Sequence, residues 1–277
     1  MRLTAILATL IALTPNASIL MASQPNPPKI HRVNFRLFDA MNFKGQPDLS
    51  PYGFEPTHIV YEASLFPAKS TATDAPSGDA IGKVVSAAPD WRGLLIVDVE
   101  RWIGLPDERE RYIDLTQRIK ALMPNRQIGY YSVVPVRDYW RAKESSGSAK
   151  YAQWQSENDK LQALADKVDV LYPSLYTFYD NQAGWVAYAR ENLREARRLA
   201  HGKPVYAFLW PMYHESNPEL RGQFIPADYW RLELETVAQY ADGAVFWGGG
   251  SKWDPSAPWW KATLAFIESR RGELHTP

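Results

Sequence analysis

Short apolar segments recur along the chain, and more polar, helix-forming stretches separate them. Several of these segments are apolar at nearly every position, which is typical of parallel strands buried on both faces. We therefore predict seven strands. They are Val33–Phe38, Thr57–Tyr61, Leu94–Val99, Gln127–Tyr131, Val168–Tyr172, Pro204–Leu209 and Gly243–Trp247.

Between the predicted strands, apolar residues recur with a period near 3.6, which predicts amphipathic helices. The clearest helix covers Gly184–Ala200, with Gly202 as its stop signal. Pro106, followed by Asp107 and Glu108, favours another helix start, because proline and acids suit the first turn. Further helices are predicted over Ala142–Leu164, Ala227–Tyr240 and Pro258–Ser269.

The alternation of strands and helices predicts an α/β fold with a parallel sheet. Seven strands favour a single TIM-like barrel, distorted from the usual form, over an open doubly wound sheet. No glycine-rich phosphate loop follows the first strand, as a nucleotide-binding sheet would need. We predict one domain over residues 24–277, with a long loop at Pro67–Gly82 on the side where barrels place their active sites.

Residues 1–23 have the features of a secretory signal peptide. Arg2 precedes an apolar run over Leu3–Leu13, and small residues follow at Ala17, Ser18, Ala22 and Ser23. The run is short for a membrane span, although an uncleaved N-terminal anchor is the alternative. We expect a secreted or periplasmic protein that is not inserted in a membrane once the signal is cleaved.

The charge balance and the missing cysteines narrow the function classes. The 277-residue chain has 31 basic and 31 acidic residues, and no basic run indicates nucleic acid as a partner. It has no cysteine, which excludes disulfides and thiolate metal ligands, and its five histidines lack ligand spacing. We expect no metal, no cofactor and a monomer. Aromatic residues make up 13% of the chain, which fits either a well-filled core or a sugar-binding cleft.

The sharpest local signal is a pair of acids at the end of an apolar strand. Asp98 and Glu100 lie two positions apart, so on a strand their side chains point the same way, with Cα atoms about 6–7 Å apart. Two carboxyl groups this close repel, and one of them then keeps its proton near neutral pH, as a general acid must. The carboxyl end of a barrel strand is also where active sites form. The alternative is that both acids pair with Arg101 or cap the next helix.

Four other predicted strands end in aromatic residues, and all these ends fall on one side of a barrel. A single such end would be core packing. Four on one rim predict a cleft for a glycan, because tyrosine hydroxyls hydrogen-bond sugars and tryptophan offers a flat apolar face. The residues concerned are Tyr130, Tyr131, Tyr172, Tyr176, Trp210, Tyr213, Trp247 and Trp253.

The ordered set of motifs resembles the hyaluronidase family of glycoside hydrolases, the animal and venom type, in a shorter, bacterial-looking form. An apolar strand ending in Asp-x-Glu with Trp shortly after is matched by Val97-Asp98-Val99-Glu100-Arg101-Trp102. The pattern Tyr-Pro-Ser-x-Tyr is matched by Tyr172-Pro173-Ser174-Leu175-Tyr176. The later strands resemble the family from Pro204-Val205 to Tyr213 and from Trp247-Gly248 to Trp253, so that the likeness spans roughly residues 33 to 255.

This resemblance implies a retaining, substrate-assisted glycosidase that cleaves an N-acetylhexosamine-containing polysaccharide. Glu100 would be the acid/base, and Asp98 would orient the substrate's acetamido group, whose carbonyl oxygen attacks the anomeric carbon. Tyr176 and Tyr213 would hold that group or stabilise the charged intermediate. Contacts to the sugars would come from Tyr131, Tyr172, Trp102, Trp210, Trp247 and Trp253.

The chain departs from the family pattern in two ways that bear on the substrate. It lacks the family's cysteines, and its first strand ends Leu37-Phe38-Asp39-Ala40-Met41-Asn42 in place of a polar, Asn-rich one. Hyaluronan is a polyanion, and the candidates for a cationic groove are Lys69, Arg101, Arg137 and Lys252, each of which also suits a solvated surface. The resemblance therefore indicates the catalytic class more firmly than the polymer.

Other functions remain open at this level. A chitinase-like barrel also uses Asp-x-Glu, but its longer motif needs further aspartates where this chain has Gly93 and Ile96. A lysozyme-like barrel acting on peptidoglycan would meet the same acetamido groups. A barrel that only binds glycans would keep the aromatic rim and tolerate loss of the acids. A structural or assembly protein would not account for the clustered aromatic strand ends.

Overall fold

The computed structural model describes residues 34–88 and 93–272, so the predicted signal segment lies outside the described residues. Six parallel strands form one curled sheet in the order β4-β3-β2-β1-β6-β5. The strands are β1 (Arg36–Lys44), β2 (Phe54–Tyr61), β3 (Leu94–Asp98), β4 (Gln127–Tyr130), β5 (Tyr206–Leu209) and β6 (Gly243–Lys252).

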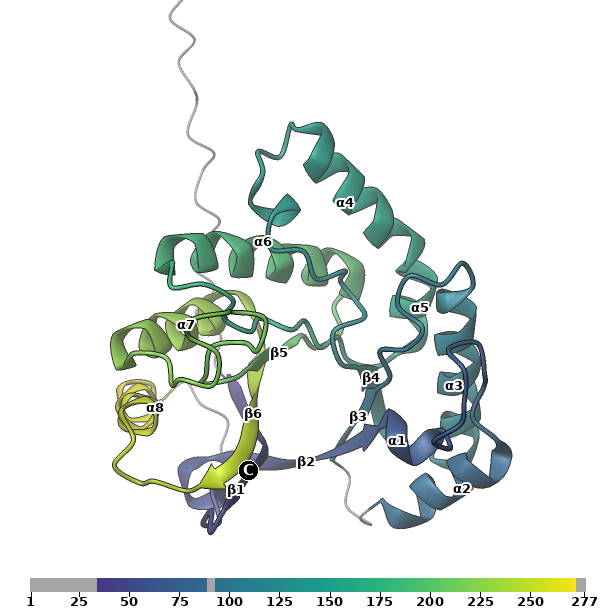
Figure 1. Cartoon of the computed structure of the whole chain (residues 1–277), viewed down its shortest axis with the longest axis horizontal. Helices are drawn as coiled ribbons and strands as arrows, with labels where there is room; N and C mark the ends of the chain where they lie inside the picture. Colours follow the sequence, from purple (N-terminus) through teal and green to yellow (C-terminus); the bar gives the residue numbers. More distant parts are fainter. Residues whose placement is uncertain (1–33, 89–92, 273–277) are drawn as a thin grey trace, which may run out of the picture.

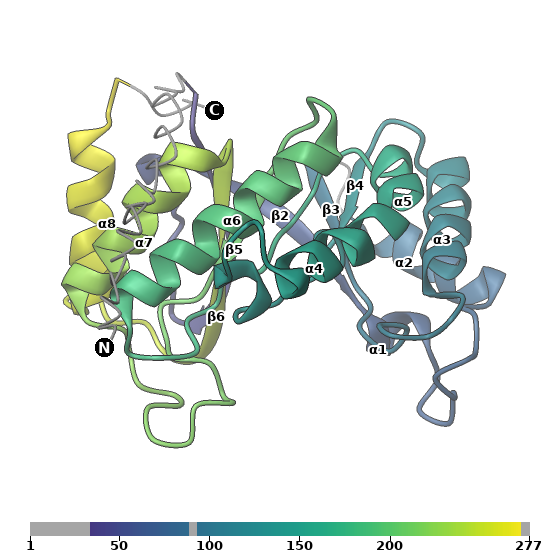
Figure 2. The same ribbon diagram turned by 90° about the horizontal axis from the view of Figure 1, so that it is seen from above.

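Helices cover the outside of the curled sheet, with α7 and α8 beside β5 and β6 and with α3 beside β3 and β4 (Figure 1). The helix α6 crosses between these two groups, as the view from above also shows (Figure 2). The helices are η1 (Ser50–Tyr52), α1 (Glu62–Leu65), α2 (Gly78–Ala87), α3 (Glu108–Leu122), η2 (Arg141–Lys143), α4 (Ala149–Lys160), α5 (Gln162–Lys167), α6 (Gln182–Ala200), α7 (Ala227–Tyr240) and α8 (Pro258–Ser269).

The predicted fifth strand takes the form of isolated parallel bridges. They join Tyr172 to Tyr131, at the end of β4, and Leu171 to Val205, just before β5. Pro173 has no backbone N–H to donate, which limits how far a regular ladder can extend. The fold is thus α/β and TIM-like, a half-barrel of six parallel strands. A seventh regular strand and a closed barrel are not confirmed.

Local capping explains where several helices begin. The side chain of Asn181 accepts a hydrogen bond from the backbone N–H of Gly184 at 2.8 Å, which starts α6. The hydroxyl of Ser148 accepts a hydrogen bond from the backbone N–H of Tyr151 at 3.1 Å, which starts α4. The predicted single helix Ala142–Leu164 is divided into η2, α4 and α5.

The predicted loop at Pro67–Gly82 is shorter than expected. Its C-terminal part already belongs to α2, which begins at Gly78 because the Ser77 hydroxyl accepts the N–H of Ala80 at 3.1 Å. The predictions for α7 and α8 agree with the structure at both ends.

Side chains alternate between the two sides of the sheet. On β3, Leu95 and Val97 pack outward against the helices, whereas Leu94 and Ile96 join a separate cluster inside the curl. Aromatic rings fill much of this inner cluster. Gly129 on β4 leaves room for them, since a Cβ there would lie 2.6 Å from the ring of the buried Tyr172. The inner cluster ends at the carboxyl ends of the strands.

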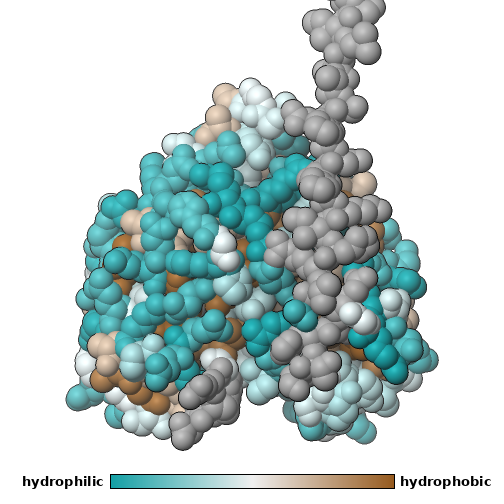
Figure 3. Space-filling model, turned by 180° about the vertical axis from the view of Figure 1, so that it is seen from behind, coloured by the Kyte–Doolittle hydropathy of each residue, from teal (hydrophilic) through white to brown (hydrophobic). Residues whose placement is uncertain are grey.

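One face of the molecule is largely polar. On the face opposite to that of Figure 1, hydrophilic side chains predominate and apolar ones form only scattered patches (Figure 3). None of the helices in the described part of the chain combines the length and apolar character that a bilayer span requires.

Candidate active site

A cavity of about 200 Å³ opens where the inner cluster ends. Its apolar floor is formed by Ile59, Ile96 and Phe208, which come from β2, β3 and β5. The loop that follows α1 and the loop between β5 and α7 project from the same side of the molecule (Figure 2). The cavity therefore lies on the side of the sheet where barrels place their active sites.

Asp98 and Glu100 both line this cavity. Asp98 is the last residue of β3 and continues the inward-facing series of that strand, while Glu100 lies just beyond the strand and is exposed. Burial raises the pKa of Asp98 to about 6, and repulsion from the carboxylates of Glu100 and Glu62 adds to the shift. The pair is thus unequal, because the free protein retains a proton at Asp98 well above the ordinary aspartate range.

Glu62, the first residue of α1, holds the backbone that carries Glu100. Its carboxylate accepts the N–H groups of Glu100 and Arg101, both at 3.2 Å. The Arg101 guanidinium lies 3.5 Å from the same carboxylate and 3.9 Å from the ring centroid of Phe66. Arg101 therefore pairs with Glu62 and not with either acid of the pair. The sequence analysis missed Glu62, which reaches this position from a separate segment.

Four aromatic rings also line the cavity, and together they form an aromatic wall. Tyr176 lies at their centre, with ring centroids 5.5 Å from Trp210, 5.7 Å from Trp247 and 5.8 Å from Tyr131. Trp210 and Trp247 are themselves 5.0 Å apart. Gly248 allows this approach, since its backbone has φ +146° and a Cβ would lie 3.1 Å from the Trp210 ring. The structure thus brings together the rings that the sequence places on four different strand ends.

His214 is a further cavity residue that the sequence analysis did not single out. Its Nδ1 accepts the backbone N–H of Ser216 at 3.1 Å, so in the neutral ring the proton resides on Nε2. Burial lowers the pKa of His214, and the Arg137 charge lowers it further, against the opposing charge of Glu215. The cavity therefore holds a neutral imidazole at neutral pH.

Four predicted site residues lie away from the cavity. Trp102 and Tyr172 are buried, with 1% and 0% of their surface exposed, so burial leaves neither ring a face for a sugar. Trp253 packs into a tryptophan cluster against α8. The Tyr213 hydroxyl donates to the Asp180 carboxylate at 3.0 Å, and Tyr213 is 3% exposed. These four side chains are not among those that line the cavity, and their predicted contacts with sugar or acetamido groups stay predictions.

In the part of the chain that the structure describes, no lysine or arginine is among the residues that line the cavity, and Arg137 is a nearby cation. Arg137 lies with its guanidinium 5.5 Å from the Phe178 ring centroid and donates to the Ser174 hydroxyl at 3.4 Å. That hydroxyl is also 3.2 Å from the hydroxyl of Tyr131, a cavity residue. Within residues 34–88 and 93–272, acidic and histidine side chains form no group that could hold a metal ion.

Comparisons with known proteins concern the fold and the family of the chain. The chain is similar in fold to bee venom hyaluronidase in complex with a hyaluronic acid tetramer, at 16% identity and a TM-score of 0.61, over 87% of this chain and 97% of that one. A monoclinic crystal form of bee venom hyaluronidase gives 18% identity and a TM-score of 0.57, over 87% and 98% of the two chains. No curated protein sequence matches the chain significantly.

A family model described as hyaluronidase, glycoside hydrolase family 56, matches residues 109–258. The matched region contains Tyr131, Tyr176, Trp210 and Trp247 but begins after Asp98 and Glu100. It covers more than half of the chain, and the fold extends the likeness to β1, β2 and β3. The chain therefore belongs to the hyaluronidase family and is a glycoside hydrolase.

Proposed function

We propose that this enzyme cleaves a polysaccharide containing N-acetylhexosamine, with retention of configuration, by substrate-assisted catalysis. One observation carries the proposal: Asp98 and Glu100 line the same cavity as four aromatic rings. Such a cavity offers a pyranose both a flat apolar contact and a proton source.

In the first step, the protonated Glu100 carboxyl gives its proton to the glycosidic oxygen, and the bond to the leaving sugar breaks. The acetamido carbonyl oxygen of the substrate forms a bond to the anomeric carbon, which gives a cyclic oxazolinium ion. In the second step, the Glu100 carboxylate takes a proton from water, and the water oxygen bonds to the anomeric carbon while the bond from that carbon to the acetamido oxygen breaks. Two inversions at the anomeric carbon give net retention.

Asp98 is the assisting carboxylate. Its burial and its position near Glu100 raise its pKa, so that in the free enzyme Asp98 keeps its proton up to about pH 6. When substrate binds, that proton is required on Glu100, and the ionised Asp98 can accept the acetamido N–H. The negative charge of Asp98 then stabilises the positive charge that develops on the ring.

For the polymer, we propose a hyaluronan-like glycan with acidic sugars. The similar fold of bee venom hyaluronidase, which was crystallised with a hyaluronic acid tetramer, supports this class. The buried backs of Tyr176 and Trp210 support a role as rigid contacts for the acetamido group and the sugar ring. A peptidoglycan- or chitin-cleaving enzyme would share the catalytic steps, so the substrate is decided by assay.

The test is product analysis with the protein and its Glu100→Gln variant. Each is incubated with hyaluronan, chondroitin, chitin oligomers and peptidoglycan, and the products are identified by mass and by the NMR signal of the first anomer released. We expect saturated products with retained configuration from hyaluronan or chondroitin, and none from Glu100→Gln. Glu219→Gln is the matched control, because Glu219 is an exposed acid in the loop after β5.

Unsaturated products would show a lyase and contradict the mechanism. Hydrolysis by Glu100→Gln at the rate of the unchanged protein would remove Glu100 as the acid. Products of inverted configuration would rule out assistance by the acetamido group. Hydrolysis of chitin or peptidoglycan alone would keep the mechanism and refute the proposed polymer.

A further inference from the structure

An aromatic surface stands outside the cavity on the same side of the sheet. We call it the Trp140 platform, and it consists of Tyr139, Trp140 and Tyr179. Trp140 is 62% exposed and Tyr179 is 41% exposed, with ring centroids 5.6 Å apart. The buried Tyr139 packs against both, with its ring centroid 5.2 Å from that of Trp140 and 4.9 Å from that of Tyr179. Leaving such rings in water forgoes the free energy that their burial would provide, so their exposure calls for an occupant.

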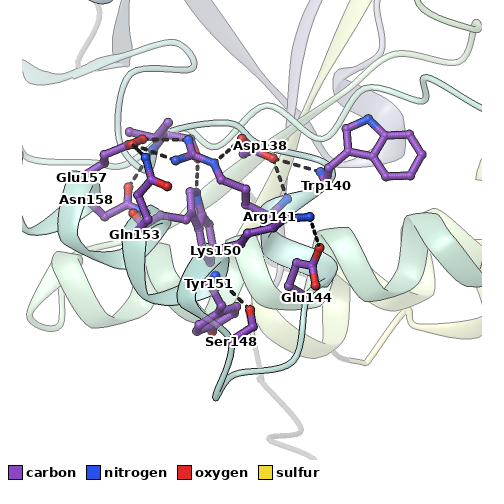
Figure 4. Close-up of polar contacts among 12 residues, drawn as sticks. Asp138, Trp140, Arg141, Glu144, Ser148, Lys150, Tyr151, Gln153, Glu157 and Asn158 are labelled. Carbon is purple, nitrogen blue, oxygen red and sulfur yellow. Dashed lines mark hydrogen bonds and ion pairs between the residues drawn. The ribbon is translucent and has the colours of Figure 1, made fainter.

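Polar contacts hold Trp140 in place. The Asp138 carboxylate accepts the backbone N–H of Trp140 at 2.9 Å and that of Arg141 at 2.7 Å. Arg141 in turn forms a two-pronged ion pair with Glu157 on α4, each bond 2.7 Å long. Figure 4 shows the indole directed away from this network. Because the ring is already fixed in this way, a ligand that stacks on it does not lose affinity to the entropy of ordering the loop.

Ring contacts connect the platform to the cavity. His214, which lines the cavity, lies 4.7 Å from Phe178, and Phe178 lies 6.4 Å from Tyr179. Both segments of the platform follow the carboxyl ends of inner segments of the fold, Tyr139 and Trp140 after β4 and Tyr179 after the bridge at Thr177. A chain of ring contacts therefore links the platform to a residue that lines the cavity.

A cation lies directly on the platform. The Nζ atom of Lys143 is 4.1 Å from the ring centroid of Tyr139 and 4.8 Å from that of Trp140. In the described part of the chain Lys143 forms no ion pair. The acids near it are engaged elsewhere, since Glu144 pairs with Lys150 at 3.1 Å and Asp138 with Arg141 at 2.6 Å. An ammonium beside flat rings suits a sugar that carries a carboxylate.

We propose that the Trp140 platform is a distal subsite that stacks one pyranose of an acidic polysaccharide, with Lys143 binding the carboxylate of a uronate. This inference rests on the proposed function, because it assumes that the polymer bound in the cavity is an acidic polysaccharide that extends beyond it. It adds a contact outside the catalytic cavity, which only chains long enough to reach it can make.

The test compares hyaluronan oligosaccharides of two lengths in titration calorimetry. The Glu100→Gln protein serves as background, so that ligands survive the measurement. We expect Trp140→Ala to weaken dodecasaccharide binding about tenfold, as loss of an aromatic contact commonly does, and to leave tetrasaccharide binding unchanged. Trp140→Phe keeps a ring and should recover most of the affinity. Lys143→Met should weaken dodecasaccharide binding and reduce its dependence on salt.

The matched control is Tyr52→Ala, which removes a ring of 40% exposure that precedes β2 and so lies at the opposite end of the strands. Equal affinity of Trp140→Ala and its parent for the dodecasaccharide overturns the platform, and so does an equal loss for both lengths. An unchanged salt dependence in Lys143→Met overturns the uronate contact. Failure of the proposed function has a different signature, namely that the unchanged protein releases no products from hyaluronan while Trp140→Ala still weakens dodecasaccharide binding alone.

Discussion

Replacing Asp98 by asparagine tests the electrostatics of the cavity apart from any substrate. The pKa of Asp98 is raised from 3.8 to about 6 because its carboxylate is partly buried and faces Glu100 and Glu62. Because its pKa is higher in the folded than in the unfolded protein, Asp98 contributes fully to the free energy of unfolding at a pH below its unfolded pKa. That contribution is lost as the pH rises through its folded pKa. Asparagine carries no charge and avoids the loss.

The size of the effect follows from the shift. A displacement of about two pKa units corresponds to about 3 kcal/mol once Asp98 is fully ionised. Because the side chain remains partly exposed to water, screening reduces this to about 1–2 kcal/mol. We expect Asp98→Asn to be more stable than the unchanged protein by this amount above about pH 7, and the advantage to fade toward about pH 4.

Urea unfolding followed by tryptophan fluorescence across this pH range measures the difference. Asp48→Asn is a control of opposite sign, because hydrogen bonds from Ser50 hold the pKa of the exposed Asp48 below its usual range. That variant should lose stability relative to the unchanged protein as the pH rises. If the difference between Asp98→Asn and its parent does not change with pH, the account of the unequal pair is wrong.

Two further predictions concern Glu62, which holds the backbone of Glu100, and Gly129, whose close packing leaves no room for a side chain. Glu62→Ala removes the acceptor that holds the Glu100 backbone and should lower kcat about tenfold or more, whereas Glu62→Gln keeps an acceptor and should chiefly lower the pKa of Asp98. The pH profile of kcat/KM separates the two, and unchanged kcat in Glu62→Ala refutes the role. Gly129→Ala should lower the free energy of unfolding by about 1–3 kcal/mol, because the new Cβ would lie 2.3 Å from a carbonyl oxygen. Gly82→Ala is the control, since a Cβ at Gly82 meets open space. Equal stability of the two variants in urea unfolding would contradict the prediction.

The sequence was informative where one local pattern determined both strand and direction. The run from Leu94 to Val97 is apolar at every position, so it predicts a strand buried on both faces. A strand has a period of two, and Asp98 therefore continues the inward series of Leu94 and Ile96. The aromatic wall was predictable for a related reason, since the carboxyl ends of parallel strands meet on one side of the sheet.

The sequence could not decide how a side chain points once the strand has ended. Trp102 follows Glu100 by two positions and resembled a rim residue, but its chain has turned and its indole donates to the backbone oxygen of Asp74 at 3.3 Å. Trp253 also follows a strand end, where packing against the helix after it decides the orientation. Period-two reasoning applies only inside the strand.

Non-local contacts were equally out of reach. Glu62 and Glu100 are 38 residues apart, and their contact exists only because β2 and β3 are neighbours in register up to Tyr61 and Asp98. His214 showed no metal-ligand spacing, yet the loop after β5 folds back and brings its ring to the aromatic wall. Neither residue belongs to a motif that a single sequence displays.

The contact between Glu62 and Arg101 explains how the cavity can keep a proton beside a nearby cation. If the Arg101 guanidinium paired with Asp98, the pKa of that carboxyl would fall, and the pair would lose its proton well below neutral pH. Glu62 instead engages Arg101, and Phe66 stacks on the same guanidinium. The carboxylate of Glu62 also repels Asp98, which raises its pKa further. One residue thus fixes the backbone of the proposed acid and adds a repulsion that, together with burial, raises the pKa of Asp98.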